Sequence, residues 1–153
     1  MNAPSVTLLD SWPQPSTVAE AVVHANERTL RLRYQAQNES VAVITFPLVS
    51  IFQFGAPNDE ALGGHPLTKL GLKFYSVHKV ENSPWVQELE KRNSVHPQHN
   101  RTRFMKDKVH YVFTFQDSTL DLVANEGEYW KPQIQICPSA SEAEKLWHDL
   151  ICG

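Results

Sequence analysis

The stretch KVHYVFTFQDSTLDLVA, residues 108–124, carries the clearest strand pattern in the chain. Apolar side chains recur at every second position on both sides of QDST, which has the composition of a tight turn. One face collects the residues Val109, Tyr111, Phe113, Phe115, Leu120, Leu122 and Ala124. Because consecutive strands joined by a short turn pair antiparallel, this pattern predicts a β-hairpin with one apolar face.

Further strands are predicted upstream of this hairpin. An alternation of period two from 29 to 35 places three apolar residues on one face, namely Leu30, Leu32 and Tyr34. The run VAVITF, residues 41–46, is rich in β-branched residues and is typical of a more buried strand. Pro47 removes a backbone donor, so LVSIFQF, residues 48–54, is expected to begin a new strand or to follow a bend.

The run GLKFYSVHKV, residues 71–80, predicts another strand. One of its faces would carry Leu72, Phe74, Ser76, His78 and Val80. A histidine among apolar neighbours is more often hydrogen-bonded and semi-buried than catalytic, so His78 is expected to be structural. A functional role for His78 would require contact with His65 or His110 across the strands.

Two helices are predicted. In NSPWVQELEKRN, Ser83 can cap a helix and Pro84 suits its first position, and the helix should end before Pro97. In SASEAEKLWHDLI, Ser139 and Glu142 have the spacing of a capping box. An apolar stripe at helical period follows in that segment, formed by Ala143, Leu146, Trp147, Leu150 and Ile151.

These elements predict an α+β fold with a mainly antiparallel sheet, either strongly bent or forming a partly open barrel. It would carry one mid-chain helix and one C-terminal helix. The 153 residues, 41% of them hydrophobic, fit a single globular domain over 1–153. Residues 1–16 are expected to form an extended N-terminal arm.

The composition restricts the class of protein. A net charge of −3 argues against a general nucleic-acid coat, and no apolar stretch approaches the roughly 18 residues that span a bilayer. There are two cysteines, Cys137 and Cys152, and the N-terminal segment lacks the pattern of a secretory signal, so a cytoplasmic location is expected. Neither a GxGxxG nor a P-loop motif is present, so no nucleotide cofactor is expected.

Charge is distributed unevenly along the chain. Residues 91–108 hold six basic residues and one acid, Asp107, a net charge of +5, whereas the remainder holds eight basic and sixteen acidic residues, a net charge of −8. Such a segment suits an anionic small molecule or an acidic protein partner, since arginine and lysine pair with phosphate and carboxylate. The candidate ligand-binding residues are His96, His99, Arg101, Arg103, Lys108 and His110. The alternative is a solvated segment paired with acidic residues such as Glu88 or Glu90.

The two histidines of HPQH, His96 and His99, raise the question of a metal site. Pro97 argues against the helix that would place them on one face, and the surrounding cations repel a divalent ion. No HExxH or CxxC motif is present. No metal is therefore expected.

The segment GAPNDEALGGHPL, residues 55–67, is predicted to be a structured loop between strands. Its candidate catalytic residues are Asp59, Glu60 and His65, which could form an acid–base group. The alternative is structural: a turn at Asn58 and Asp59, a short helical turn after it, and a stop at the glycine pair 63–64.

Three pieces of the chain resemble a family of small uncharacterised proteins over about residues 55–124. They are GAPNDEALGGHPL, GLKFYSVHKVENSPWVQELEKRNSVHP and HYVFTFQDSTLDLVA. No activity is known for that family. The resemblance therefore implies a self-standing domain and no mechanism or catalytic residue.

Three hypotheses about function follow. The favoured one is a binding module for an anionic small molecule or an acidic partner, through the basic segment with its histidines. The second is a hydrolase that uses histidine and carboxylate groups, with or without a metal. The third is an interaction protein that forms a homodimer through an open sheet edge. The first two depend on whether loop 55–67 and segment 91–110 share one pocket.

Overall fold

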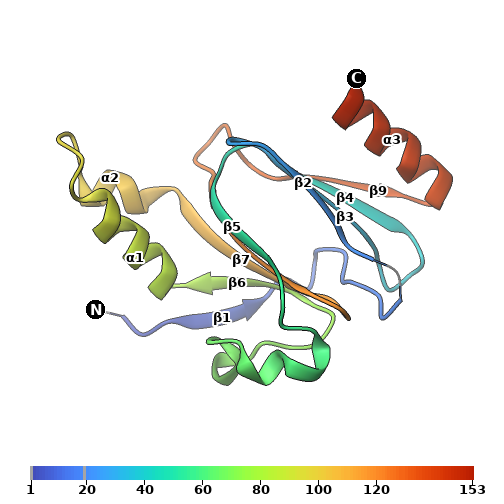
Figure 1. Ribbon diagram of the computed structural model, residues 1–153, viewed down its shortest axis with the longest axis horizontal. Helices are drawn as coiled ribbons and strands as arrows, with labels where there is room; N and C mark the ends of the chain where they lie inside the picture. Colours follow the sequence, from blue (N-terminus) through green and yellow to red (C-terminus); the bar gives the residue numbers. More distant parts are fainter. Residues whose placement is uncertain (1, 19) are drawn as a thin grey trace.

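The strands form two antiparallel sheets in the computed structural model, which describes residues 2–18 and 20–153 (Figure 1). Sheet 1 has the order β1–β6–β7–β8–β5, and these strands span Ser5–Leu8, Val77–Glu81, Lys108–Thr114, Thr119–Asn125 and Val49–Gly55. Sheet 2 has the order β2–β3–β4–β9, with bounds Val22–Ala25, Leu30–Gln35, Val41–Phe46 and Gln133–Cys137. The expected α+β class with antiparallel sheets is confirmed, and the strands divide between two sheets that do not close.

The hairpin predicted from residues 108–124 is formed by β7 and β8. Thr114 pairs with Thr119 at the turn, and Tyr111 and Phe113 pair with Leu122 and Leu120 further along. This register keeps all the large apolar residues of the two strands on one face, because side chains of a strand alternate between faces.

The main core lies between the two sheets. Sheet 1 contributes Val77, Tyr111, Phe113, Leu120, Leu122 and Ala124, and sheet 2 contributes Leu30, Leu32, Tyr34, Ala42, Ile44 and Phe46. Each large side chain buried in this way stabilises the fold by roughly 1.5–3 kcal/mol. Since the inner faces are used for the core, the outer face of sheet 1 is left to other elements.

The chain passes from sheet 2 to sheet 1 at Pro47, where β4 ends and β5 begins. This is the bend expected at that proline. The segment before β2 also belongs to the packed structure: β1 pairs with β6, and Trp12 packs against Phe46 and Tyr111. The residues expected as an N-terminal arm thus supply an edge strand and a core side chain.

The strand predicted over 71–80 is shorter in the structure, and this part of the prediction was wrong. Strand β6 begins only at Val77, because Gly71 and Tyr75 have positive φ angles of 109° and 51° that interrupt extended backbone. His78 is fully buried, accepts a hydrogen bond from the Lys73 N–H at 3.0 Å and donates to the Val112 carbonyl at 3.1 Å. It has the structural role expected for it.

Helices α1 (Pro84–Asn93) and α3 (Ala140–Cys152) begin at the predicted caps, Ser83 and Ser139. A third helix, α2 (Arg101–Lys106), lies inside the basic segment and is capped by Asn100. In Figure 1, α1 and α2 lie beside sheet 1, while α3 lies along sheet 2. Among residues 2–18 and 20–153, no helix has the length and apolar character needed to cross a bilayer.

Two short 3₁₀ helices occupy the long loop between β5 and β6. They are η1 (Asp59–Gly64) and η2 (Thr68–Leu70). Asn58 caps η1 by accepting the Ala61 N–H at 3.1 Å, so the first part of the loop is the short capped helical turn described above as the structural alternative. The loop covers part of the outer face of sheet 1, where Leu67 packs with Val80 and Val112.

Candidate functional site

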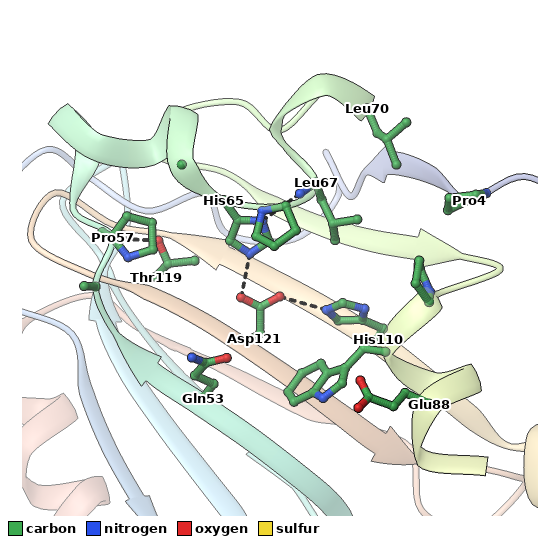
Figure 2. Close-up of a pocket in the computed structure, with 15 residues that line it drawn as sticks. Pro4, Gln53, Pro57, His65, Leu67, Leu70, Glu88, His110, Thr119 and Asp121 are labelled. Atoms are coloured by element: carbon green, nitrogen blue, oxygen red, sulfur yellow. Dashed lines mark hydrogen bonds and ion pairs between the residues drawn. The ribbon is translucent and has the colours of Figure 1, made fainter. Parts of the chain in front are cut away.

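A cavity of about 510 Å³ opens on the outer face of sheet 1 (Figure 2). Its floor comes from strands β5, β7 and β8, one wall from the loop with η1 and η2, and the other wall from the start of α1. Its lining residues are Pro4, Gln53, Ala56, Pro57, Gly64, His65, Pro66, Leu67, Leu70, Pro84, Trp85, Glu88, His110, Thr119 and Asp121. We call this cavity the Asp121 pocket.

The carboxylate of Asp121 joins two histidines at the floor of the pocket. The Nε2–H of His65 donates to Oδ2 and the Nε2–H of His110 donates to Oδ1, each at 2.8 Å. Figure 2 shows the carboxylate between the two rings. The two rings come from segments 45 residues apart in the chain, and the loop and the hairpin therefore meet at one side chain.

His65 is fixed by the end of η1. It is the C-cap residue of this 3₁₀ helix, and the backbone N–H of Leu67 donates to its Nδ1 at 3.0 Å. A ring nitrogen that accepts a hydrogen bond carries no proton, so the proton of the neutral ring lies on Nε2. The backbone thus selects the tautomer that donates to Asp121.

His110 is fixed by the start of α1. Its Nδ1 lies 2.7 Å from Oγ of Ser83, the residue that caps the helix by accepting the Val86 N–H. Because Nε2 donates to Asp121, Nδ1 of the neutral ring accepts a hydrogen bond from the Ser83 hydroxyl. The Trp85 ring meets the His110 ring edge to face, with centroids 5.2 Å apart, which further restricts its orientation.

Two opposing effects act on the pKa of Asp121. Burial raises it, whereas the hydrogen bonds and charge interactions of His110 and His65 lower it, and the net result is a pKa below the ordinary value for aspartate. The carboxylate is therefore held ionised although its side chain is only 13% exposed. The pKa of nearby His78 is lowered, chiefly by burial, so that ring is held neutral.

The arrangement is poorly suited to a metal ion. In residues 2–18 and 20–153, no group of three or more His, Cys, Asp or Glu side chains is placed to hold one. The geometry gives the reason: the Nε2 atoms of His65 and His110 carry the protons that bind Asp121, and their Nδ1 atoms are engaged by Leu67 and Ser83.

The other two candidates of the loop lie outside the pocket lining. Asp59 begins η1 and accepts a hydrogen bond from the Tyr75 hydroxyl at 2.6 Å. Glu60 is exposed on the same helix. The structure therefore separates these two acids from His65, which instead pairs with Asp121.

Of segment 91–110, only His110 is among the pocket-lining residues. His99 and Arg101 turn inward to buried Glu90 of α1, at 2.7 Å and 2.5 Å. The Asn93 amide donates to the other ring nitrogen of His99 at 2.9 Å. These contacts hold the segment of α2 against α1. Glu90 is one of the two acidic residues that the sequence analysis named as partners of a solvated basic segment.

The remaining candidates of the basic segment also lie away from the pocket lining. His96 is exposed and its Nδ1 accepts the Gln98 N–H at 3.1 Å. Arg103 is exposed on α2. The Lys108 ammonium lies 4.1 Å from the centre of the Phe104 ring, a cation–π contact.

Asp121 is the central residue of the site, and the sequence analysis missed it. Asp121 lies between Leu120 and Leu122. The apolar alternation of the hairpin identifies the face of these two leucines, and the Asp121 side chain lies on the opposite face. The hairpin register gave a signal: with the turn at QDST, Val112 opposes Asp121, and His110 becomes its diagonal neighbour on the same face.

No family model, no curated protein and no solved structure matches this chain. The resemblance noted over residues 55–124 thus stays a prediction. Functional inference depends on the geometry of the site.

Proposed function

We propose that this protein is a binding module for a small molecule, which it takes up in the Asp121 pocket. The observation that carries the proposal is a fixed His65–Asp121–His110 cluster at the floor of a cavity of about 510 Å³. Ligand pockets are commonly about 300–1,000 Å³, mainly apolar, and equipped with a few convergent polar groups. The Asp121 pocket has this composition.

The walls supply the apolar part of such a site. They consist of aliphatic or proline side chains and one tryptophan, namely Pro4, Ala56, Pro57, Pro66, Leu67, Leu70, Pro84 and Trp85. Burial of a ligand's apolar surface against these groups gives affinity, and the fixed polar groups of the floor orient the ligand. The cluster is held by backbone and cap hydrogen bonds before any ligand arrives, which lowers the cost of binding.

A pair of glycines allows a matched test. A Cβ at Gly63 or at Gly64 would meet no atom within 4 Å, and of the two only Gly64 lines the pocket. We expect Gly64→Leu to narrow the pocket, whereas Gly63→Leu adds the same side chain to the same 3₁₀ helix outside it. We expect both variants to fold, because an added Cβ meets no atom within 4 Å at either position and neither glycine has a positive φ angle.

The probes are three molecules of one shape: 4-fluorobenzyl alcohol, 4-fluorobenzylamine and 4-fluorobenzoate. Fluorine NMR titration should show saturable binding of at least one probe to the wild-type protein, with at least fivefold weaker binding to Gly64→Leu and unchanged binding to Gly63→Leu. Absence of binding by all three probes, or equal weakening in both variants, would contradict the proposal.

Acid–base catalysis of the hydrolase type is a second candidate for the same pocket. It is favoured by His110, since the Ser83 hydroxyl can either donate a hydrogen bond to Nδ1 or, after rotation, accept a hydrogen bond from a protonated Nδ1. The ring can therefore gain and release a proton while it stays bonded to Asp121. Hydrolysis of 4-nitrophenyl acetate that is lost in Asp121→Asn and kept in Gly63→Leu would support this candidate, whereas equal rates would exclude a role of the cluster in it.

Anion binding by the basic segment stays a separate proposal for the surface of α2. It is supported by exposed Arg103 and Lys106, which form no ion pair with any described residue. Inorganic sulfate should then raise the melting temperature of the wild type more than that of Arg103→Glu. An identical response of both proteins would contradict it.

A cytoplasmic location is likewise proposed. Its support is that Cys137 and Cys152 are free thiols, which suits a reducing compartment. Fractionation of cells that express the tagged chain tests this location directly, and recovery in an oxidising compartment would contradict it.

A further inference from the structure

We propose that the ligand of the Asp121 pocket is an amine: a small aromatic or aliphatic body that carries a protonated primary or secondary amino group. The inference rests on the proposed function and names the chemical class of its ligand. It follows from the charge of the pocket, from the acceptor atoms that Asp121 leaves open, and from the apolar side chains beside them.

The lining residues of the pocket carry negative charge and no compensating cation of their own. They include two carboxylates, Asp121 and Glu88, and neither lysine nor arginine. Glu88 lies at the start of the helical wall and is paired with Arg92 at 2.8 Å on the exposed surface, so its charge is partly compensated. The charge at the floor therefore depends on Asp121 and on the state of its two histidines.

The contacts of His65 fit its neutral form. Its Nδ1 accepts the Leu67 N–H, and a proton added there would point at that N–H and break the bond. The contacts of His110 also fit its neutral form. The Ser83 hydroxyl donates a hydrogen bond to Nδ1, and its oxygen accepts the Val86 N–H. When both rings are in the neutral forms that these contacts fit, the cluster carries the full negative charge of the carboxylate.

The carboxylate still has room for further donors. Each oxygen of an ionised carboxylate accepts about two hydrogen bonds, and each oxygen of Asp121 receives one from a histidine. The side chain is 13% exposed and lies between His65 and His110 on the pocket side of the sheet (Figure 2). An ammonium group has donors enough to bind both oxygens at once.

The depressed pKa of Asp121 agrees with this assignment, since at neutral pH the carboxylate is ionised and an alkylamine is protonated. A buried anion without a counter-ion is costly, and a ligand cation would relieve that cost. An anionic ligand would instead meet repulsion from the floor.

The surroundings of the carboxylate suit the body of such an amine. Trp85 lies beside His110 in the pocket lining, and an indole ring can bind a cation or an aromatic ligand. Gln53 is the direct cross-strand partner of Asp121 and lies next to it on the floor of the pocket. Its exposed amide can accept a hydrogen bond from the same amino group.

The charge series of probes tests the inference. In wild-type protein, 4-fluorobenzylamine should bind about tenfold more tightly than 4-fluorobenzyl alcohol, because a charge-assisted hydrogen bond is about twice as strong as a neutral one. The isosteric anion 4-fluorobenzoate should bind most weakly. In Asp121→Asn, the preference for the amine should fall to about twofold or less, while the alcohol still binds.

A second variant keeps the Asp121 cluster intact. Gln53→Lys places a cation opposite Asp121 on an edge strand and should reduce the preference for the amine at least fivefold. Gln133→Lys makes the same change on β9, the edge strand of sheet 2, and should leave the preference unaltered. Both variants have the same net charge, so nonspecific electrostatics are controlled.

The outcomes separate the two proposals. If the alcohol or the benzoate binds at least as tightly as the amine, and binding still responds to Gly64→Leu, the pocket is real and the amine inference is wrong. If no probe binds, the proposed function itself fails. If the amine preference persists in Asp121→Asn and in Gln53→Lys, the amine binds elsewhere and the inference is overturned.

Discussion

His110 on β7 and Asp121 on β8 are diagonal neighbours on the outer face of sheet 1, and their side chains meet at 2.8 Å. Their strands belong to one hairpin, so the contact is a local product of its register. The carboxylate then reaches His65 in the loop, also at 2.8 Å. One aspartate thereby ties the loop that forms a wall of the pocket to the sheet that forms its floor.

Asp121→Asn should lower the free energy of unfolding by about 1–3 kcal/mol, because the amide group places donors against one of the two ring N–H groups. Urea denaturation measures this change. Asp117→Asn, in the exposed turn of the same hairpin, is the matched control and should stay within about 0.5 kcal/mol of the wild type. Equal losses in the two variants would show that the cluster does not stabilise the fold.

The pKa of Asp121 gives that stabilisation a pH dependence. Its pKa is lower in the folded protein than the ordinary value of 3.8, so its contribution is fully present above that value and is lost as pH falls through the folded pKa. The difference in stability between wild type and Asp121→Asn should therefore stay constant from pH 6 to about 5 and shrink as pH falls below about 4. A difference that is also constant below about pH 4 would contradict the depressed pKa.

His78 should make the protein less stable at mildly acidic pH. Its pKa in the folded state is lowered by burial, so below an ordinary value of about 6.5 the unfolded chain takes up a proton that the folded protein refuses. Melting temperatures should fall between pH 7 and pH 5, and the fall should be smaller in His78→Gln. The exposed His24 is the control position, and His24→Gln should keep the wild-type slope.

Glu90→Gln tests the contacts between α1 and α2. Glu90 is buried and binds both His99 and Arg101, so its neutralisation should cost about 1–3 kcal/mol of unfolding free energy. Glu88→Gln removes the exposed pair with Arg92 and should cost less than about 0.5 kcal/mol. Chemical denaturation of both variants compares them, and equal effects would mean that the cluster at Glu90 is not stabilising.

Ser83→Ala should be more harmful than Ser139→Ala, although both serines cap a helix. Loss of a cap costs about 1 kcal/mol, and Ser83 in addition binds Nδ1 of buried His110. We expect Ser83→Ala to cost about 1–2 kcal/mol more than Ser139→Ala in urea denaturation, since a buried acceptor is left unpaired. Equal costs would show that the bond to His110 contributes nothing.

Local patterns predicted much of the fold because they depend on neighbours in the chain. The alternation in residues 108–124 gave β7 and β8, and the caps at Ser83 and Ser139 gave the starts of α1 and α3. Two patterns misled. Alternation over 71–80 ignored the positive φ angle at Tyr75, and the charge pattern of residues 91–108 did not predict helix α2.

The candidate site was only partly accessible to sequence reasoning. His65 and His110 stood out as chemically useful residues, yet nothing local to either one shows that they share a carboxylate. The charge of residues 91–108 can be counted from the chain, whereas the direction of their side chains cannot. His99 and Arg101 point to Glu90, a choice that depends on how α2 packs against α1.

The sequence by itself determined the class of fold, the hairpin and the helix caps, since backbone preferences and side-chain alternation act over a few residues. Only the tertiary structure decided that an ionised Asp121 joins a loop histidine to a strand histidine beneath an apolar cavity. The reason is that such a contact arises from the packing of segments far apart in the chain. The charge of Asp121 and the tautomers of His65 and His110 are then set by burial and by hydrogen bonds between different segments of the chain.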